Sequence, residues 1–425
     1  TITGDLFNLP AGAVGAAVGA HWRKLTTTTT PNALSVANAY RLANTQPFFG
    51  EYTIMEEFAE LQVPILKDAA LAKRLNVNVA ARHTDYSTTG SVTTWKAGLV
   101  WQINSDLRLR AARSRDIRAP NLNELFSRGR QTNAVIDDTG PGGTGQFYSG
   151  VPNIATGNLN LKPEVADSSV IGFVYQPSGL KGLSLAMDFY TTRIDDAIFV
   201  AGGAIAVREC NEDPNSPLCA FVTRGPTAAS PRAVIRTQNS PVNLNSELST
   251  GLDFEVSYRV PLSNWFANSQ PGNLVVRAIA GYIDEYSAVS PLAPTINWAG
   301  NGRATPQGPA LPRVRGNLSF NHIRGSFATF LQMRYIGGMT WDKTRLLGVT
   351  TDYNNVPSTA YFDGQIGYRT QVLGRDTEIY LNVANILDRE PTYAPRNTGA
   401  TPLPTDPGLF DQVGRMFRLG IKTRF

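Results

Sequence analysis

The side chains that could carry out chemistry are few and widely separated in this sequence. Histidine occurs three times, at His21, His83 and His322, each in a different predicted strand. A metal or haem site needs several ligands close together, and a hydrolase needs histidine beside a serine or an aspartate. No local motif of either kind is present. We therefore expect no catalytic residue, no metal site, no bound cofactor and no enzymatic activity.

The two cysteines, Cys210 and Cys219, lie close together in the polar segment 208–219. A disulfide, two free thiols and a two-cysteine metal site are the three possible states. The metal site is the least favoured, because no histidine lies nearby to complete a ligand set. The cellular compartment decides between the other two.

A glycine-rich segment, 140–145, could be mistaken for a phosphate-binding loop. It lacks the Lys-Ser/Thr ending of such a loop, and no helical pattern follows it. We expect a surface-loop tip there.

The composition excludes several classes of protein. Charged residues make up 17% of the 425 residues, which is below the ~25% typical of soluble domains. No apolar run reaches the ~18 residues that a transmembrane helix needs. The net charge is +5, from 39 basic and 34 acidic residues, and the basic residues are scattered. The sequence therefore predicts no nucleic-acid partner.

Many segments alternate strictly between apolar and polar residues, which is the pattern of a strand with two different faces. Leu185, Met187 and Phe189 are one example. These segments exceed the ~5–6 residues common in soluble sheets and match the ~9–11 residues of a tilted transmembrane strand. The predicted strands are 12–22, 51–63, 73–85, 92–102, 106–114, 165–176, 182–193, 247–260, 273–284, 312–322, 326–336, 358–369, 376–386 and 413–425.

The connections between these strands alternate in length. Every second gap, starting with 64–72, is a short or modest turn, and the others are mostly long and rich in Gly, Pro, Asn and Thr. The exception among the long ones is 86–91. A soluble sandwich explains alternating residues but not alternating connections. Short turns at one rim and long loops at the other are typical of an outer-membrane β-barrel, whose sheet must close in lipid.

This topology places the cysteine loop on the cell surface, an oxidising environment, and so favours a Cys210–Cys219 disulfide. It also predicts girdles of aromatic residues near the strand ends, although ordinary packing is the alternative. The candidates are Trp95, Trp101, Tyr282, Tyr335 and Tyr368.

Four segments resemble the C-terminal barrel of a TonB-dependent outer-membrane receptor. Segment 107–126 contains Ser-Arg-Asp-Ile-Arg-Ala-Pro-Asn-Leu-Asn-Glu-Leu-Phe, and segment 157–164 reads Gly-Asn-Leu-Asn-Leu-Lys-Pro-Glu. Segment 381–391 reads Leu-Asn-Val-Ala-Asn-Ile-Leu-Asp-Arg-Glu-Pro, and the last strand ends on the aromatic Phe425. Their order and spacing extend the resemblance over roughly residues 75–425.

The resemblance implies an all-β fold, a transmembrane antiparallel β-barrel. About 14 strands would lie here, of a 22-stranded barrel with a plugged lumen. Residues 1–425 would form one partial barrel domain, with the plug and the first strands outside it. A fragment, one half of a split receptor and a smaller 14-stranded barrel are the open possibilities. As a piece of a larger barrel, the chain would expose two unpaired edges in lipid. Phe425 would serve as the outer-membrane assembly signal.

The implied function is active transport. The receptor would bind a scarce ligand at its surface loops and import it with energy relayed by TonB. A ferric siderophore or another metal chelate is the expected cargo, with an oligosaccharide or cobalamin as alternatives. A passive outer-membrane channel and a structural or surface-interaction barrel are the competing functions. The implied partners are outer-membrane lipid and lipopolysaccharide, the TonB complex through the plug, and the missing N-terminal strands or a complementary chain.

Two sets of residues are candidates for contacts within such a receptor. The polar positions of the strands predict arginines that face the lumen, where they would contact plug carboxylates or attract an anionic ligand. These are Arg82, Arg108, Arg110, Arg259, Arg315, Arg334, Arg369 and Arg418. The candidates for ligand contact in the loops are Phe48, Phe49, Phe147, Tyr148, Trp298, Trp341 and Tyr353.

Overall fold

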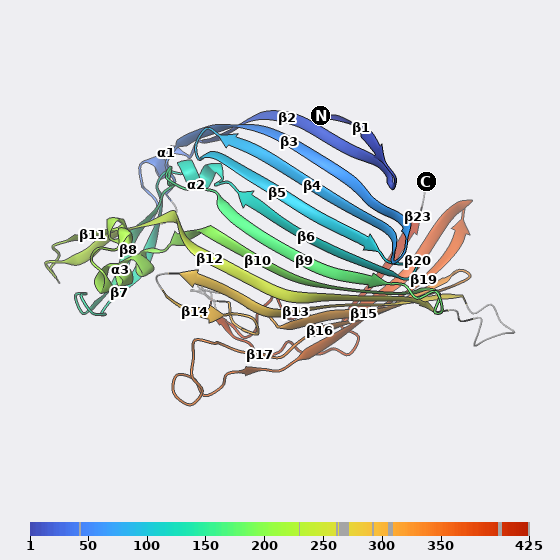
Figure 1. The fold of residues 1–425 in the computed structure, drawn as a ribbon. Coiled ribbons are helices and arrows are strands. Elements are labelled where there is room, and N and C mark those ends of the chain that lie inside the picture. The colour runs from blue at the N-terminus through green and yellow to red at the C-terminus, as the bar shows by residue number, and fades with distance from the viewer. Residues whose placement is uncertain are drawn as a thin grey trace.

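The computed structural model describes residues 1–41, 44–228, 230–260, 262, 272–290, 293–304, 309–397 and 402–423. Within these residues, fifteen strands pair one after another into a single antiparallel wall (Figure 1). They are β1 (Ile2–Leu9), β2 (Gly12–Thr29), β3 (Phe48–Ala69), β4 (Ala72–Tyr86), β5 (Gly90–Gln102), β6 (Leu107–Arg118), β9 (Glu164–Tyr175), β10 (Leu183–Ala201), β12 (Ala233–Val260), β13 (Asn273–Ser290), β15 (Val314–Arg324), β16 (Phe327–Ile336), β19 (Thr359–Val372), β20 (Arg375–Ala384) and β23 (Met416–Thr423).

All fourteen predicted strands are confirmed, and the wall has one further strand, β1, that the alternation pattern does not reveal. The residues of β1 do not keep apolar and polar side chains on separate faces, and the register shifts between Asp5 and Asn8. A period-two search cannot find such a strand. A two-residue turn at 10–11 connects β1 to β2.

The connections alternate in length as predicted. Short turns at 10–11, 70–71, 103–106, 325–326 and 373–374 lie at one rim, and the connections of the other rim include 30–47, 119–163, 202–232, 337–358 and 385–415. The short link 87–89 is the exception on the long rim, also as predicted. The tight turns use left-handed backbone at Gly325 (φ +55°) and Gly374 (φ +74°), which glycine adopts without strain.

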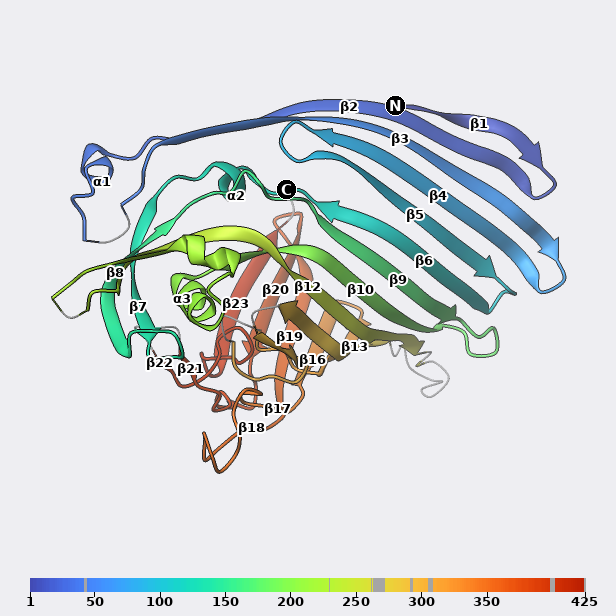
Figure 2. The same ribbon diagram turned by 60° about the vertical axis from the view of Figure 1, so that its left-hand side comes forward.

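The wall curves into an open trough, with β1 at one edge and β23 at the other (Figures 1 and 2). Within the described residues, no hydrogen-bonded pairing joins β1 to β23. Each of these strands has one partner, β2 for β1 and β20 for β23.

The register aligns the alternation of each strand with that of its neighbours, so the wall has one apolar and one polar face. Ala111, Ile171 and Phe189 lie in one row of the apolar face. On the polar face, Gly172 lies between Arg110 and Asp188 in the next row. All five predicted girdle aromatics fall on the apolar face by register, as do the predicted apolar positions of β10 and β12. No described helix is long and apolar enough to cross a membrane.

The buried clusters lie in the layer of connections at the long rim. Its elements are α1 (Ala33–Val36), α2 (Leu122–Phe126), β7 (Arg130–Asp138), β8 (Gln146–Ala155), α3 (Gly203–Glu212), the 3-10 helix η1 (Pro217–Phe221), β11 (Val222–Gly225), β14 (Ala293–Asn297), β17 (Met339–Thr340), β18 (Asn355–Val356), β21 (Arg396–Asn397) and β22 (Pro402–Leu403). Leu125 of α2 packs against Tyr52 and Ile54 of β3. Because these two β3 residues lie on the polar face, the loop layer folds over that face.

Candidate functional site

Two long connections, 119–163 and 202–232, fold into one unit at the long rim. Its sheet pairs β7 with β8, β8 with the outer part of β12 in parallel, and β11 with β12. Ile136, Val151, Val207 and Val234 form its buried cluster. A disulfide joins Cys210 in α3 to Cys219 in η1. We call this arrangement the Asp138 unit, after the aspartate at its centre.

Asp138 is fully buried and binds both connections through hydrogen bonds. Arg224 donates to its carboxylate from Nη1 at 2.9 Å and from Nη2 at 2.8 Å, and Asn211 donates from Nδ2 at 2.8 Å. Thr144 donates from its backbone N–H at 3.1 Å and from Oγ1 at 2.6 Å. Burial raises the pKa of Asp138, but the donors, with Arg224 first among them, outweigh burial and hold this pKa well below its ordinary value.

The glycine-rich segment 140–145 packs against α3 instead of forming a free loop tip. A Cβ on Gly142, which has a φ of +74°, would lie 2.3 Å from the backbone oxygen of Asn211. A Cβ on Gly143 would lie 2.2 Å from the backbone oxygen of Asp138. Beside this contact is a cavity of about 380 Å³, lined by Asp137, Thr139, Gly140, Pro141, Ala204, Ile205, Arg208, Asn211 and Glu212.

A second group of loops, 295–304, 309–313 and 337–358, is tied together by buried polar residues. Fully buried Asn301 accepts the backbone N–H of Lys343 at 3.1 Å. Lys343 Nζ donates to the backbone oxygens of Asn297 and Ala299, and burial followed by the charge of Arg313 lowers its pKa. Burial raises the pKa of Asp342, but Thr344 and then Arg303 donate to its carboxylate and hold this pKa below its ordinary value.

The predicted ligand-contact residues separate into exposed and packed side chains. Trp298 is 2% exposed, so its indole offers no surface to a ligand. Trp341 packs against the cluster around Tyr361 and donates from Nε1 to Pro395. Tyr148 packs in the Asp138 unit and contacts Thr144. Phe48 is half-buried, and the side chains with ample free surface are Phe49, Phe147 and Tyr353.

All eight predicted lumen arginines lie on the polar face by register, and four of them already have carboxylate partners. Arg82 lies 3.6 Å from Glu56, and Arg110 donates from Nε to Asp188 at 2.7 Å. Arg334 pairs with Asp363 and Asp411, and Arg369 pairs with Glu378. In the described part of the chain, no side-chain hydrogen bond or ion pair is found for Arg108, Arg259, Arg315 and Arg418.

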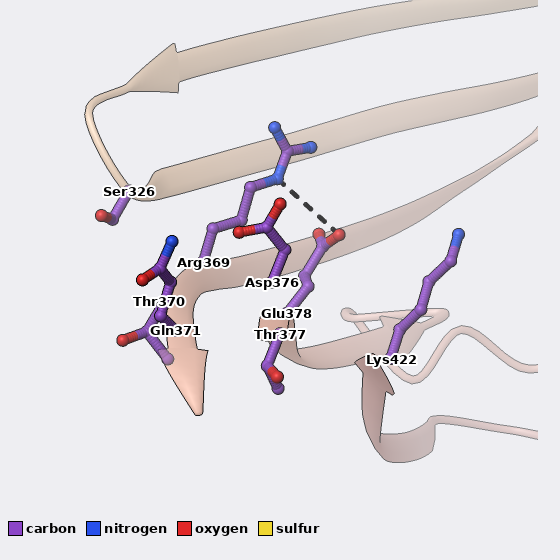
Figure 3. Close-up of a pocket in the computed structure, with 8 residues that line it drawn as sticks. All are labelled: Ser326, Arg369, Thr370, Gln371, Asp376, Thr377, Glu378 and Lys422. Carbon is purple, nitrogen blue, oxygen red and sulfur yellow. Dashed lines mark ion pairs between the residues drawn. The ribbon is translucent and has the colours of Figure 1, made fainter. Parts of the chain in front are cut away.

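A polar groove of about 620 Å³ lies at the short-turn rim and is lined by residues of β19, β20 and β23 and of the turn before β16 (Figure 3). Arg369 of β19 and Glu378 of β20, which both line this groove, form an ion pair at 3.7 Å. Asp376 and Lys422 extend the charged lining, and Ser326, Thr370, Gln371 and Thr377 complete it. Neighbouring charges of both signs suit a polar polypeptide surface better than a small apolar ligand.

The three histidines stay apart in the structure. His21 on β2 lies 3.5 Å from Glu56, and His83 on β4 contacts the hydroxyl of Thr93. His322 lies on β15. Among the described residues, no three His, Cys, Asp or Glu side chains group as metal ligands do. Phe425, the predicted assembly signal, lies outside the described residues.

An antiparallel wall with one apolar face, short turns at one rim and folded loops at the other defines the class of outer-membrane β-barrel proteins. Residues 1–386 match the sequence profile of the family described as "TonB dependent receptor-like, beta-barrel". The chain belongs to this family, whose barrels lie in the outer membrane. No curated protein sequence matches the chain.

Solved structures share the fold at low sequence identity. A mutant of the ferric enterobactin receptor PfeA from Pseudomonas aeruginosa, in complex with enterobactin, is 14% identical with a TM-score of 0.65, over 99% of this chain and 53% of that one. The siderophore receptor PirA from Acinetobacter baumannii is 14% identical with a TM-score of 0.60, over 99% and 53%. The ferric citrate transporter FecA in its unliganded form is 10% identical with a TM-score of 0.53, over 98% and 52%. This chain spans about half the length of these proteins.

Proposed function

We propose that this chain is the barrel part of an outer-membrane receptor for active transport. The receptor binds a ferric siderophore, or another metal chelate, at its loop layer and imports it with energy that TonB relays. The barrel acts with a plug and with further strands that complete the wall. It transports its ligand and catalyses no reaction.

Membership of the TonB-dependent receptor family over residues 1–386 is the observation that carries this proposal. Two structural features support it. The long connections fold over the polar face, as a ligand-binding layer above a lumen requires. That face also presents Arg108, Arg259, Arg315 and Arg418 without partners in the described chain, and such cations suit a plug with surface carboxylates or an anionic chelate. The names of the similar receptors point to iron chelates as the cargo class.

Growth under iron limitation tests the proposal. Cells that make the protein, and matched cells without TonB, are supplied with single ferric chelates as the iron source. We expect growth on at least one chelate that requires both the protein and TonB, together with saturable binding of that chelate by the purified protein. TonB-independent passage of small solutes would instead show a passive channel. Failure to bind every chelate, combined with stable association with another surface protein, would show an interaction barrel.

A further inference from the structure

The cavity of about 380 Å³ in the Asp138 unit lies between the segment that ends β7 and one face of α3. The residues of α3 that line it recur at the three- and four-residue spacing of a single helix face. They are Ala204, Ile205, Arg208, Asn211 and Glu212. Small-molecule sites in proteins have volumes of about 300 to 1,000 Å³, so this cavity is large enough for a small ligand.

The two walls of the cavity are held in place by contacts within the chain. Asn211 donates from Nδ2 to Asp138 at 2.8 Å and accepts from Nη2 of Arg224 at 2.7 Å. Its backbone oxygen lies so close to Gly142 that a Cβ there would be only 2.3 Å away. The disulfide from Cys210 fixes the last turn of α3 to η1. The cavity is therefore preformed, and a ligand would lose little affinity to ordering of its walls.

The lining contains charges of both signs. Arg208 and Glu212 are four residues apart and are therefore neighbours on the helix surface. Asp137 belongs to the other wall, where its carboxylate accepts from Thr139. In the described part of the chain, no hydrogen bond or ion pair is found for the carboxylate of Glu212.

Arg208 can donate to a ligand in addition to its contact within the chain. Its Nη2 donates to Glu209 at 3.3 Å, and 47% of its side chain is exposed. A guanidinium has five N–H donors in a planar arrangement that matches a carboxylate. Because Glu209 already faces this guanidinium, the two carboxylates of the lining outweigh it, and a ligand with negative charge alone is disfavoured.

Apolar groups complete the lining beside these charges. Pro141 extends from the β7 side, and Ala204 and Ile205 belong to the first turn of α3. A ligand that matches the whole cavity therefore needs an ammonium group, a carboxylate and a small apolar part. An α-amino acid with an aliphatic side chain combines these three groups in one small molecule.

We propose that this cavity binds a small α-amino acid with an apolar side chain. Glu212 and Asp137 hold the ammonium group, Arg208 holds the carboxylate, and Ile205 and Pro141 contact the side chain. Because the ligand contacts both walls, its binding stabilises the Asp138 unit. The proposal does not depend on which ligand the receptor transports.

Calorimetric titration of the full protein, purified from membranes in detergent, tests the proposal with three probes. L-leucine has both charged groups, isopentylamine lacks the carboxylate, and isocaproate lacks the ammonium group. We expect saturable binding of L-leucine and binding of each analogue that is weaker by about tenfold or more, since each analogue loses a charge-assisted contact. Hydrogen exchange in β7 and α3 should become slower when L-leucine is bound.

Glu212→Gln should weaken binding of L-leucine about tenfold, because it removes a carboxylate that faces the ammonium group. Asp213→Asn is the matched control. Asp213 is adjacent in the chain but does not line the cavity, and its Oδ1 accepts the backbone N–H of Asn215 at 2.9 Å, a contact that asparagine can keep. Both variants should match the wild-type protein in hydrogen exchange without ligand, which shows that the unit remains folded.

Three results would overturn the proposal. The first is a lack of saturable L-leucine binding at millimolar concentration. The second is binding of isopentylamine as tight as that of L-leucine, which would show a site for a simple cation. The third is equal weakening by Glu212→Gln and Asp213→Asn, which would show a general effect of charge.

Discussion

Replacing Asp138 with asparagine should increase local unfolding of the Asp138 unit and leave the strand pairing of the wall intact. The variant keeps the size of the side chain but removes the charge that Arg224 and Asn211 meet at 2.8 Å. Arg224 has only 17% of its side chain exposed, so its guanidinium would remain buried without a counter-charge. Breaking a buried pair on one side costs about 3 kcal/mol or more. Local opening should therefore become roughly 100-fold more frequent.

Hydrogen exchange of the purified protein measures this effect. Faster exchange is expected in β7, β8 and α3, while β15, β16 and β19 keep their protection, because these strands make no contact with Asp138. Asp137→Asn is the matched control, since Asp137 is exposed and, among the described residues, its carboxylate accepts from Thr139 alone. Unchanged protection in the Asp138 variant, or equal loosening in the control, would refute the reasoning.

Three further predictions concern the loop layer. The carboxyls of Asp138 and Asp342 have pKa values below their ordinary value of 3.8. Their contribution to the stability of the loops is therefore fully present above pH 3.8 and is lost as the pH falls through the folded-state pKa values. Proteolysis of the loops at a series of acid pH values should show no loosening until the pH falls below 3.8, and loosening at pH 5 to 6 would contradict this assignment. Reduction of the Cys210–Cys219 disulfide should destabilise α3 and η1, because the unfolded segment regains the conformational entropy that the cross-link removes. The closed loop is short, which limits this loss to a few kcal/mol. Limited proteolysis should then cut this segment while the wall stays heat-modifiable on gels. Gly142→Ala should destabilise the Asp138 unit by about 2 kcal/mol or more. Gly145 has the same φ of +74°, but a Cβ there would meet open space, so Gly145→Ala should cost only about 1 kcal/mol of backbone strain. Equal effects of the two variants in thermal melts of the loop layer would exclude the close contact with Asn211.

The wall was predictable because lipid and lumen impose opposite demands on alternate residues. Leu185, Met187 and Phe189 carry this pattern without interruption, and the alternating turn lengths set the direction of each strand. Strand β1 escaped detection because its bulge and its mixed faces hide the period. Strands β7, β8 and β11 escaped because they lie within connections, where lipid imposes no pattern.

The site could be predicted only in part. The positions of the lumen arginines follow from strand parity alone, but their partners depend on pairing register, as with Arg110 and Asp188. The role of Asp138 depends on Arg224, which is 86 residues away, and no local spacing encodes that contact. Trp298 looked like a loop-surface aromatic in the sequence, and only the packing of the loops shows it to be buried.

The Asp138 unit has its own buried cluster around Ile136 and its own covalent cross-link, and its strands join the wall only through the outer part of β12. The wall beneath it depends on lipid and on strand pairing. The two parts are therefore under different selective constraints, since a change in recognition chemistry above need not alter membrane insertion below. Because the unit consists of two connections, exchanging it between receptors would mean replacing 119–163 and 202–232 together, while β9 and β10 between them stay in the wall.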